Sequence, residues 1–389
     1  MVTKRKSETP GDSISATVSS DALRRAVKTL DEARVGAGFA SIPILTCIVL
    51  AAGPDGVRAE YRGTDLTVEI DVEGNGSGCL ALPARPLRAF LDSVTSETVD
   101  IKKEEGDSRA GLTAGRMALK VVAMSVADTP VRKAPRQGER EFALAEGVLD
   151  SLMRYVIPFI STEETRYYLN GVSLEIEGKT LAAVATDGHR LAKRQTTLGA
   201  SIPDMESIIV PRNVCKLALS AIGEAEVDVR VSDKAIRFSA EGVSIDADLI
   251  SGTFPNWRRV VPAVGEASFT FNGKDAGRFL ASAMRMTKNR DKAVALTPGE
   301  GASLSLSFQA IHDNVDQFAT VIAATVKGQP QRIGANGKYL AGLIRLLGGG
   351  DITINQSEKG DGSSYTGAVR ISSDKGQEGD VIVLMPMRV

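Results

Sequence analysis

The sequence repeats one pattern three times at an almost constant interval, and this feature constrains the fold more than any other. In each copy an extended segment runs directly into an amphipathic helical pattern; the extended segments are residues 16–18, 142–144 and 269–271. Val18 and Leu144 are 126 residues apart, and Leu144 and Phe271 are 127 residues apart. An interval this regular predicts three structurally similar units.

A second strand-to-helix signal recurs at nearly the same interval along the chain. Extended segments ending near Pro83, Pro211 and Ala335 lead into helical patterns at 85–91, 214–222 and 339–347, with spacings of 128 and 124 residues. Between the helices, apolar and polar residues alternate with a period of two, as at 227–231, and Gly, Asp and Lys turns separate these runs. Each unit is therefore expected to hold two helices packed on antiparallel sheets, which is an α+β fold.

The interval also fixes the expected domain boundaries. Units of about 125 residues have the commonest size of an independently packed domain. We expect an N-terminal tail at 1–14, rich in Lys, Ser, Thr and Pro, followed by domains at 15–138, 139–264 and 265–389.

Composition limits the classes of function. The chain has 47 Lys and Arg against 48 Asp and Glu, a formal charge of −1, so bulk attraction to a polyanion is excluded. A nucleic-acid contact would need positive charge gathered on one surface. Aromatic residues make up 5%, which gives poor support for a platform that stacks unpaired bases.

The sequence contains few candidates for catalysis. The three cysteines lack metal-ligand spacing, and His189 and His312 are too few for most metal sites. Phosphate-loop, nucleophile-elbow and zinc-protease motifs are absent from the sequence. We therefore expect no catalytic residue, no metal and no cofactor. With no apolar run of about 20 residues and no secretory signal, we expect a cytoplasmic protein without membrane contact.

Basic residues concentrate on the exposed faces of the predicted helices, and acidic residues concentrate in strands and turns. In the first helix, Leu23, Ala26, Val27 and Leu30 form one stripe, with basic residues on the opposite side. Contacts from such helices to phosphates would be independent of base sequence and would weaken with salt. The residues expected to face a duplex are Arg24, Arg25, Lys28, Arg85, Arg88, Arg154, Arg212, Lys216 and Arg278.

Four blocks in order resemble the bacterial DNA polymerase III β subunit family, the β sliding clamps. They are Arg166-Tyr-Tyr-Leu-Asn-Gly171, Ala185-Thr-Asp-Gly-His-Arg-Leu-Ala192, Phe254-Pro-Asn-Trp-Arg-Arg-Val-Val-Pro262 and Met385-Pro-Met-Arg-Val389. Weaker matches at 42–45, 63–66, 82–85 and 336–340 extend the resemblance over residues 15–389. The resemblance implies three clamp-type domains forming half of a ring. It implies a head-to-tail homodimer that encircles double-stranded DNA and gives the polymerase processivity, with no chemistry of its own.

The family also docks short linear motifs in a cleft between its second and third domains. The resemblance implies as partners the α subunit of DNA polymerase III, the ATP-driven clamp loader, other polymerases and repair proteins. Carried over onto the matching motifs, the cleft would consist of Leu169, Thr186, Gly188, His189, Arg190, Leu191, Pro255, Arg259, Val260, Val383, Leu384, Met385, Pro386, Met387 and Arg388. We expect Pro386 to end strand pairing and to free the flexible thioether side chains of the two flanking methionines.

The resemblance also implies residues that close the ring, and a few positions differ from the family pattern. Met117, Arg285 and Met286 are expected at the ring-closing interface. Phe39 stands where the family commonly has a basic residue that contacts DNA, and Glu163 and Glu164 would repel phosphate.

Two alternatives stay open: a divergent or second clamp, and a decoy that binds partner peptides without encircling DNA. A hydrolase using His189 and Asp187 is the least favoured alternative, because no nucleophile motif accompanies that pair.

Overall fold

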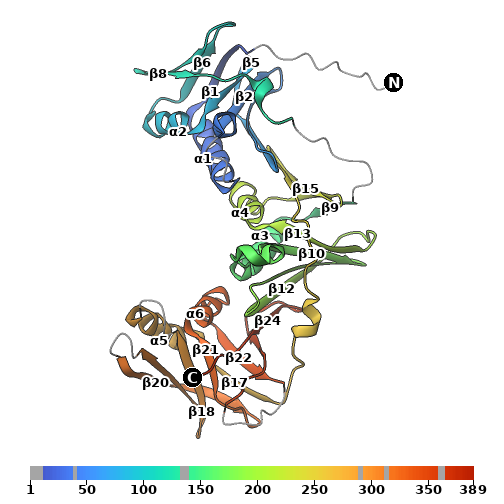
Figure 1. Cartoon of the computed structure of the whole chain (residues 1–389), viewed down its shortest axis with the longest axis vertical. Helices are drawn as coiled ribbons and strands as arrows, with labels where there is room; N and C mark the ends of the chain where they lie inside the picture. Colours follow the sequence, from blue (N-terminus) through green and yellow to red (C-terminus); the bar gives the residue numbers. More distant parts are fainter. Residues whose placement is uncertain (1–11, 38–41, 132–139, 288–291, 311–314, 358–363) are drawn as a thin grey trace. The chain divides into compact units, whose positions relative to one another are not determined.

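The structure of the chain, a computed structural model, describes residues 12–37, 42–131, 140–287, 292–310, 315–357 and 364–389. Residues 1–11 of the expected tail, Phe39 and His312 lie outside these ranges. The described chain is α+β, as expected, with helices packed on two 12-stranded antiparallel sheets (Figure 1). It divides into two compact units, which are described one at a time: 1–151 with 198–203 and 210–251, and 152–197 with 204–209 and 252–389.

The first unit contains one sheet, ordered β8-β7-β6-β1-β5-β2-β3-β4-β16-β15-β14-β9. Its strands are β1 (Ile14–Ser19), β2 (Cys47–Gly53), β3 (Gly56–Arg62), β4 (Leu66–Val72), β5 (Gly74–Pro83), β6 (Thr98–Lys103), β7 (Arg109–Ala114), β8 (Met117–Val122), β9 (Arg140–Leu144), β14 (Val227–Val231), β15 (Ala235–Ala240) and β16 (Val243–Asp248). Helices α1 (Ser20–Ala37), α2 (Ala84–Ser93) and α4 (Arg212–Ala221) accompany it, with short turns η1 (Pro43–Thr46) and η2 (Val126–Asp128). Pairing of β4 with β16 makes the sheet continuous between segments far apart in sequence, from Leu66–Ala247 to Ile70–Val243.

The second unit contains the other sheet, ordered β13-β10-β11-β12-β24-β23-β22-β17-β20-β19-β18-β21. Its strands are β10 (Gly171–Glu177), β11 (Thr180–Thr186), β12 (Arg190–Thr197), β13 (Met205–Pro211), β17 (Ala267–Asn272), β18 (Ala293–Gly299), β19 (Ser303–Ala310), β20 (Val315–Lys327), β21 (Ile333–Asn336), β22 (Asp351–Gln356), β23 (Val369–Ser373) and β24 (Val381–Leu384). Its helical elements are α5 (Gly273–Met286), α6 (Gly337–Leu346), η3 (Ile157–Phe159), η4 (Glu164–Leu169) and η5 (Trp257–Val260). Helix α3 (Val148–Val156) begins in the first unit and ends in the second.

All six expected junctions from strand to helix are present: β1 to α1, β5 to α2, β9 to α3, β13 to α4, β17 to α5 and β21 to α6. The local sequence explains where these helices form. In α1, Leu23, Val27 and Leu30 are fully buried while Arg25 and Lys28 are exposed, so the apolar period of the sequence selects the buried face. Asn272 and Asn336 cap α5 and α6, each accepting a hydrogen bond from a first-turn N–H.

The pairing of β12 with β24 positions the candidate site described below. Arg190 pairs with Leu384 and Lys193 with Val381, so a strand from the middle of the chain lies beside its last strand. Leu191, Ala192, Ile382 and Val383 are buried in this pair. In the part of the chain that the structure describes, no helix is long and apolar enough to cross a membrane.

Candidate functional site

The second unit has a pocket of about 260 Å³ beside the junction of β12 and β24. Its walls come from η4, from the turn between β11 and β12, from η5 and from the end of β24. The lining residues are Arg166, Tyr168, Leu169, Thr186, Gly188, His189, Arg190, Leu191, Pro255, Asn256, Trp257, Val260, Val383 and Met385.

The pocket has a buried apolar floor, and two apolar side chains are exposed at its rim. Leu169, Leu191 and Val383 are at most 3% exposed, whereas Val260 and Met385 are 54% and 44% exposed. Buried aliphatic side chains form a fixed floor, and the exposed valine and methionine can change rotamer around a ligand. A site of this kind suits an extended peptide segment that buries one or two apolar side chains.

A rigid turn forms one wall. The Thr186 hydroxyl donates to the Arg190 carbonyl oxygen at 2.8 Å and accepts from the Gly188 N–H at 3.1 Å. Asp187 Oδ1 accepts from the backbone N–H groups of His189 and Arg190, both at 3.0 Å. Gly188 has φ +86°, and a Cβ there would lie 2.5 Å from Arg166 Nη1. The backbone angle therefore favours glycine at this position, and a larger residue would also displace the Arg166 guanidinium.

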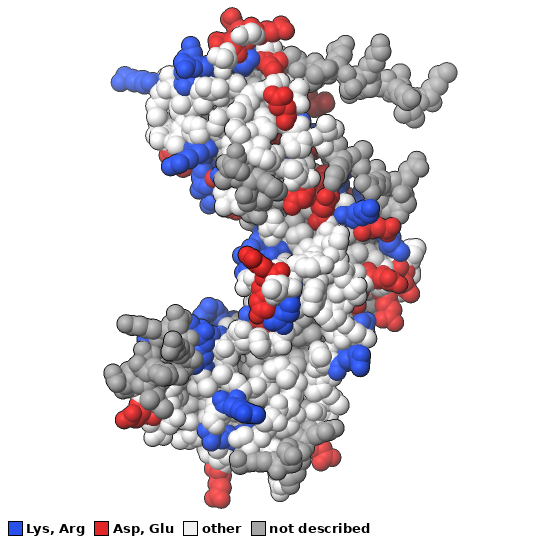
Figure 2. All heavy atoms as spheres, viewed as in Figure 1, with Lys and Arg blue, Asp and Glu red and all other residues white. Residues whose placement is uncertain are grey.

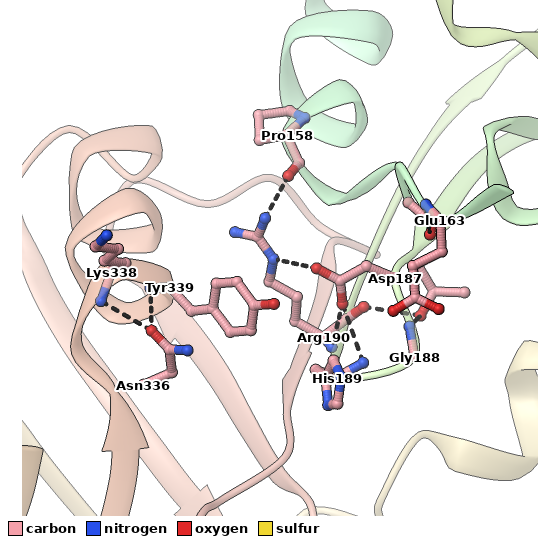
Figure 3. A network of polar contacts seen from close by, with 11 residues as sticks. Pro158, Glu163, Asp187, Gly188, His189, Arg190, Asn336, Lys338 and Tyr339 are labelled. Carbon is pink, nitrogen blue, oxygen red and sulfur yellow. Dashed lines mark hydrogen bonds and ion pairs between the residues drawn. The ribbon is translucent and has the colours of Figure 1, made fainter. Parts of the chain in front are cut away.

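Arg190 is the centre of a network that ties the pocket wall to helix α6 (Figure 3). Its Nε donates to Asp187 Oδ2 at 2.9 Å, and its Nη2 donates to the Pro158 carbonyl oxygen at 2.7 Å. The guanidinium carbon lies 4.2 Å from the ring centroid of Tyr339 and 5.1 Å from that of Phe159. Burial raises the pKa of the Tyr339 phenol, with Asp187 adding to the effect. These contacts hold β12, η3 and α6 in one arrangement.

Trp257 also lines the pocket and is held by charged neighbours. Its indole N–H donates to Glu175 Oε1 at 3.3 Å, and the Arg258 guanidinium lies 4.5 Å from a Trp257 ring centroid. Arg258 also pairs with Glu175 at 2.8 Å. Lys193 Nζ lies 5.8 Å from the indole, and burial, together with the charge of Arg258, lowers the pKa of this lysine. Trp257 is the only tryptophan in the chain, so its fluorescence reports on this pocket.

The C-terminal residues are fixed by backbone hydrogen bonds. The Met385 N–H donates to the His189 carbonyl oxygen at 2.8 Å, and the Met387 N–H donates to the Gly334 carbonyl oxygen at 2.9 Å. A Cβ on Gly334 would lie 2.1 Å from the Met387 oxygen. Strand β24 ends at Leu384, before Pro386, and the side chains of Met385 and Met387 are 44% and 40% exposed, although the Met387 backbone N–H is bonded to β21.

Ten of the 15 residues expected in the cleft line this pocket: Leu169, Thr186, Gly188, His189, Arg190, Leu191, Pro255, Val260, Val383 and Met385. The other five are not among its lining: Arg259, Leu384, Pro386, Met387 and Arg388. Leu384 is buried in the sheet, between Arg190 and Val369. Four lining residues were missed, namely Arg166, Tyr168, Asn256 and Trp257, although they lie inside the sequence blocks that predicted the others.

Two of the expected DNA-facing arginines are held by the protein itself. Arg24 donates to the Leu91 and Val94 carbonyl oxygens at 2.8 and 2.7 Å and pairs with Asp21. Arg88 pairs with the buried Asp31 at 2.8 Å. Burial would raise the pKa of Asp31, but hydrogen bonds from Arg88 and Arg34 hold this pKa below its usual value.

The remaining expected basic residues lie mostly at the surface. Exposed side chains are those of Arg25, Lys28, Arg85, Arg154, Lys216 and Arg278, while Arg212 is half-buried. Arg278 pairs with Asp275 in the first turn of α5. Figure 2 shows Lys and Arg side chains at the places of α4 and α6, with Asp and Glu mostly over strands and loops of the same face.

The residues expected at a ring-closing interface lie at element ends. Met117 begins β8, which is one of the two edge strands of the first sheet, and Met286 ends α5; each is 38% exposed. Arg285 is exposed beside Met286. Of the two acids noted before Arg166, Glu163 pairs with Arg166 at 2.6 Å and Glu164 is exposed.

The geometry around His189 gives no support to acid–base chemistry. Both Asp187 oxygens are committed, one to two backbone N–H groups and one to the Arg190 side chain. In the described structure no hydrogen bond joins the Asp187 carboxylate to the His189 imidazole, whose ring lies 6.4 Å from that of Tyr339. Within the described ranges, no group of three or more His, Cys, Asp or Glu could hold a metal ion.

Comparison with known proteins gives one consistent family. Residues 143–256 match the central domain of the DNA polymerase III beta subunit. Over 360 residues the chain is 27% identical to the beta sliding clamp of Pseudomonas aeruginosa, and over 363 residues it is 29% identical to that of Caulobacter vibrioides; each alignment covers 90% of this chain and 93% of the relative.

Solved structures show the same fold. A sliding clamp from Bartonella birtlesii bound to griselimycin is 25% identical with a TM-score of 0.87, covering 97% of this chain and 100% of the other. The sliding clamp from Caulobacter crescentus is 25% identical with a TM-score of 0.82, covering 96% of this chain and 100% of the other. The similarity therefore spans nearly the whole length of both proteins.

Proposed function

The chain belongs to the bacterial DNA polymerase III β subunit family, the β sliding clamps, and on that premise we propose that it works as a DNA sliding clamp. Two copies, joined head to tail, would encircle duplex DNA and tether the replicative polymerase. The domains proposed for each copy are 15–138, 139–264 and 265–389. The protein would be an accessory subunit without chemistry of its own, located in the cytoplasm.

The observation that carries this proposal is the pocket beside β12 and β24. Its apolar floor and flexible rim have the chemistry needed to hold a short linear motif, and its residues come from the sequence blocks shared with clamps. We propose that the α subunit of DNA polymerase III, the clamp loader, other polymerases and repair proteins dock here. Griselimycin, to which the Bartonella birtlesii clamp is bound, would occupy the same pocket.

The proposed contact with DNA uses helix surfaces rather than base readout. Exposed basic residues on α1, α2, α3, α4 and α5 would meet phosphates, and each contact would be weak and independent of sequence. Weak contacts permit sliding, because retention comes from closure of the ring rather than from affinity. The proposed closing interface joins Met117 of one copy to Arg285 and Met286 of the other.

Mass in solution tests the ring. A clamp is expected as a stable dimer, twice the chain mass of 41.1 kDa, at micromolar concentration in analytical ultracentrifugation. Replacing the exposed Met117 with Lys is expected to shift the equilibrium toward the monomer, because it places a like charge beside Arg285 of the other copy. A wild-type chain that sediments as a monomer would instead support the decoy interpretation, in which partner peptides bind without a ring.

A further inference from the structure

A second cavity, of about 190 Å³, lies in the first unit, where β4 pairs with β16. Its walls come from the turn between β3 and β4, from the hairpin of β14 and β15, and from the end of β16. Pockets for drug-sized ligands are usually about 300–1,000 Å³, so this cavity suits a smaller molecule. The charged residues that line it are Arg230, Lys234, Arg237, Asp65, Asp246 and Asp248.

A row of polar side chains crosses the sheet at this cavity. The strand register places Arg230 of β14 opposite Arg237 of β15. It also places Arg237 opposite Asp246 of β16, and Asp246 opposite Thr67 of β4. Residues directly opposite each other in antiparallel strands point to the same face of the sheet. Their neighbours along the strands point to the other face and are at most 1% exposed; these are Val229, Ile236, Phe238 and Ile245. The row therefore lies on the face away from the apolar core.

The two arginines of this row are incompletely paired. Because they are directly opposite each other, their like charges destabilise the sheet. The Arg237 side chain is 14% exposed and its Nε donates to Asp246, but its Nη2 is buried without a hydrogen-bond partner among the described residues. Arg230 pairs with Glu141 at 3.1 Å, and both side chains are exposed, so this pair is weak. A carboxylate between the two guanidinium groups would remove their repulsion, since a guanidinium matches a carboxylate in shape and charge.

Positive and negative charge are separated across the cavity. In the sheet order β4-β16-β15-β14, Asp65 precedes β4 and Asp248 ends β16, whereas the three cations belong to the β14–β15 hairpin. Asp65 accepts a hydrogen bond from the Thr64 hydroxyl at 3.3 Å, and no described cation forms an ion pair with it. Three acids and three bases make the lining neutral as a whole. Such a lining favours a ligand that carries one charge of each sign over a polyanion or a simple cation.

Backbone hydrogen bonds hold the two sides of the cavity in place. The Asp248 N–H donates to the Asp65 carbonyl oxygen, and the Leu249 N–H donates to the Lys234 carbonyl oxygen, both at 2.8 Å. At the hairpin, the Ser232 N–H donates to the Ala235 carbonyl oxygen at 2.9 Å. The charged side chains therefore stand on a fixed frame, which lowers the entropy lost when a ligand binds.

We infer that this cavity binds a small zwitterion with the chemistry of a free α-amino acid. The carboxylate of the ligand lies between Arg230 and Arg237, and its ammonium group faces Asp65. The ligand bridges β4 and the β14–β15 hairpin, so its binding stabilises the pairing of β4 with β16. This inference goes beyond the proposed clamp function and does not depend on it.

Isothermal titration calorimetry of the full chain, with the common L-amino acids added one at a time, tests the inference. We expect at least one of them to bind with a Kd below about 1 mM. Acetate and methylamine each carry only one of the two charges, and we expect both to bind at least about tenfold more weakly than that amino acid.

Two variants locate the ligand. Arg237→Gln and Asp65→Asn are each expected to weaken binding by about tenfold or more, because each removes one charged hydrogen bond to the ligand. Thermal melting verifies that Arg237→Gln folds, since this side chain is largely buried; Asp65→Asn changes an exposed side chain and decides the matter if it does not. Arg58→Gln is the matched control and should bind as wild type, because Arg58 pairs with Asp71 at 3.0 Å on the same face of the sheet but outside the cavity.

Three results would overturn the inference. The first is that none of the amino acids binds. The second is that acetate binds as tightly as the best amino acid, which would make the cavity a simple anion site. The third is that folded Arg237→Gln or Asp65→Asn protein binds the amino acid as wild type does, which would place the ligand elsewhere.

Discussion

Deleting residues 385–389 is expected to weaken peptide binding by about 10- to 100-fold, the usual effect of losing a central side chain from an interface. Met385 forms one wall of the pocket, and its removal leaves an apolar ligand partly exposed to water. The β24 pairings with β12 and β23 lie at residues 381–384 and stay in place. Binding of a polymerase-derived peptide or of griselimycin is followed by Trp257 fluorescence.

Two point variants test whether weaker peptide binding comes from displacement of the pocket wall or from general damage to the C-terminal residues. Gly334→Ala keeps the chain complete but places a Cβ 2.1 Å from the Met387 oxygen, so the tail must move and affinity should fall. Arg388→Ala removes an exposed side chain that is not part of the pocket lining and should bind as wild type. Full affinity after deletion of 385–389 would show that peptides bind elsewhere.

Asp380→Ala is expected to lower the free energy of unfolding of the second unit by about 3–5 kcal/mol, because it leaves a buried arginine without its counter-ion. Arg194 Nε and Nη2 donate to the Asp380 carboxylate at 3.0 and 2.6 Å, and the two side chains are only 13% and 7% exposed. The Arg194 guanidinium also lies 3.9 Å from the Tyr155 ring. Burial and the charge of Asp380 raise the pKa of that phenol.

Asp275→Ala is the matched control, because it also removes a carboxylate paired with arginine in the same unit. Its partner Arg278 is 80% exposed, so the expected decrease in the free energy of unfolding is below about 1 kcal/mol. Urea denaturation followed by Trp257 fluorescence measures both variants, since this tryptophan lies in the second unit. Equal stabilities for the two variants would show that the Arg194–Asp380 pair is not an anchor of β12 and β24.

Local pattern predicts the helices of this chain well. Leu23, Val27 and Leu30 recur with the period of a helix, and burial of that stripe decides where α1 forms. The alternation at 227–231 likewise predicts β14, because one face of a strand is buried. What these patterns cannot predict is which strands become neighbours: the pairings β4 with β16 and β12 with β24 join segments far apart in sequence.

The candidate site, too, combines residues that the sequence predicts with residues that it does not. Residues inside the blocks that carry the resemblance, such as Leu169 and Met385, lie together in one pocket. The missed Trp257 and Tyr168 come from the same blocks, but their direction depends on the three-dimensional path of η4 and η5. Sequence also does not reveal that carbonyl oxygens accept hydrogen bonds from Arg24, or that Asp31 pairs with Arg88.

The central claim, that two copies of the chain enclose DNA, is tested most directly by DNA topology. Protein assembled with its loader on nicked circular DNA is separated from free protein by gel filtration, and the circle is then linearised with a restriction enzyme. We expect the protein to stay on the circle in moderate salt and to slide off the linear molecule, because closure rather than affinity retains it. Equal retention on both forms, or loss from both, would contradict this account.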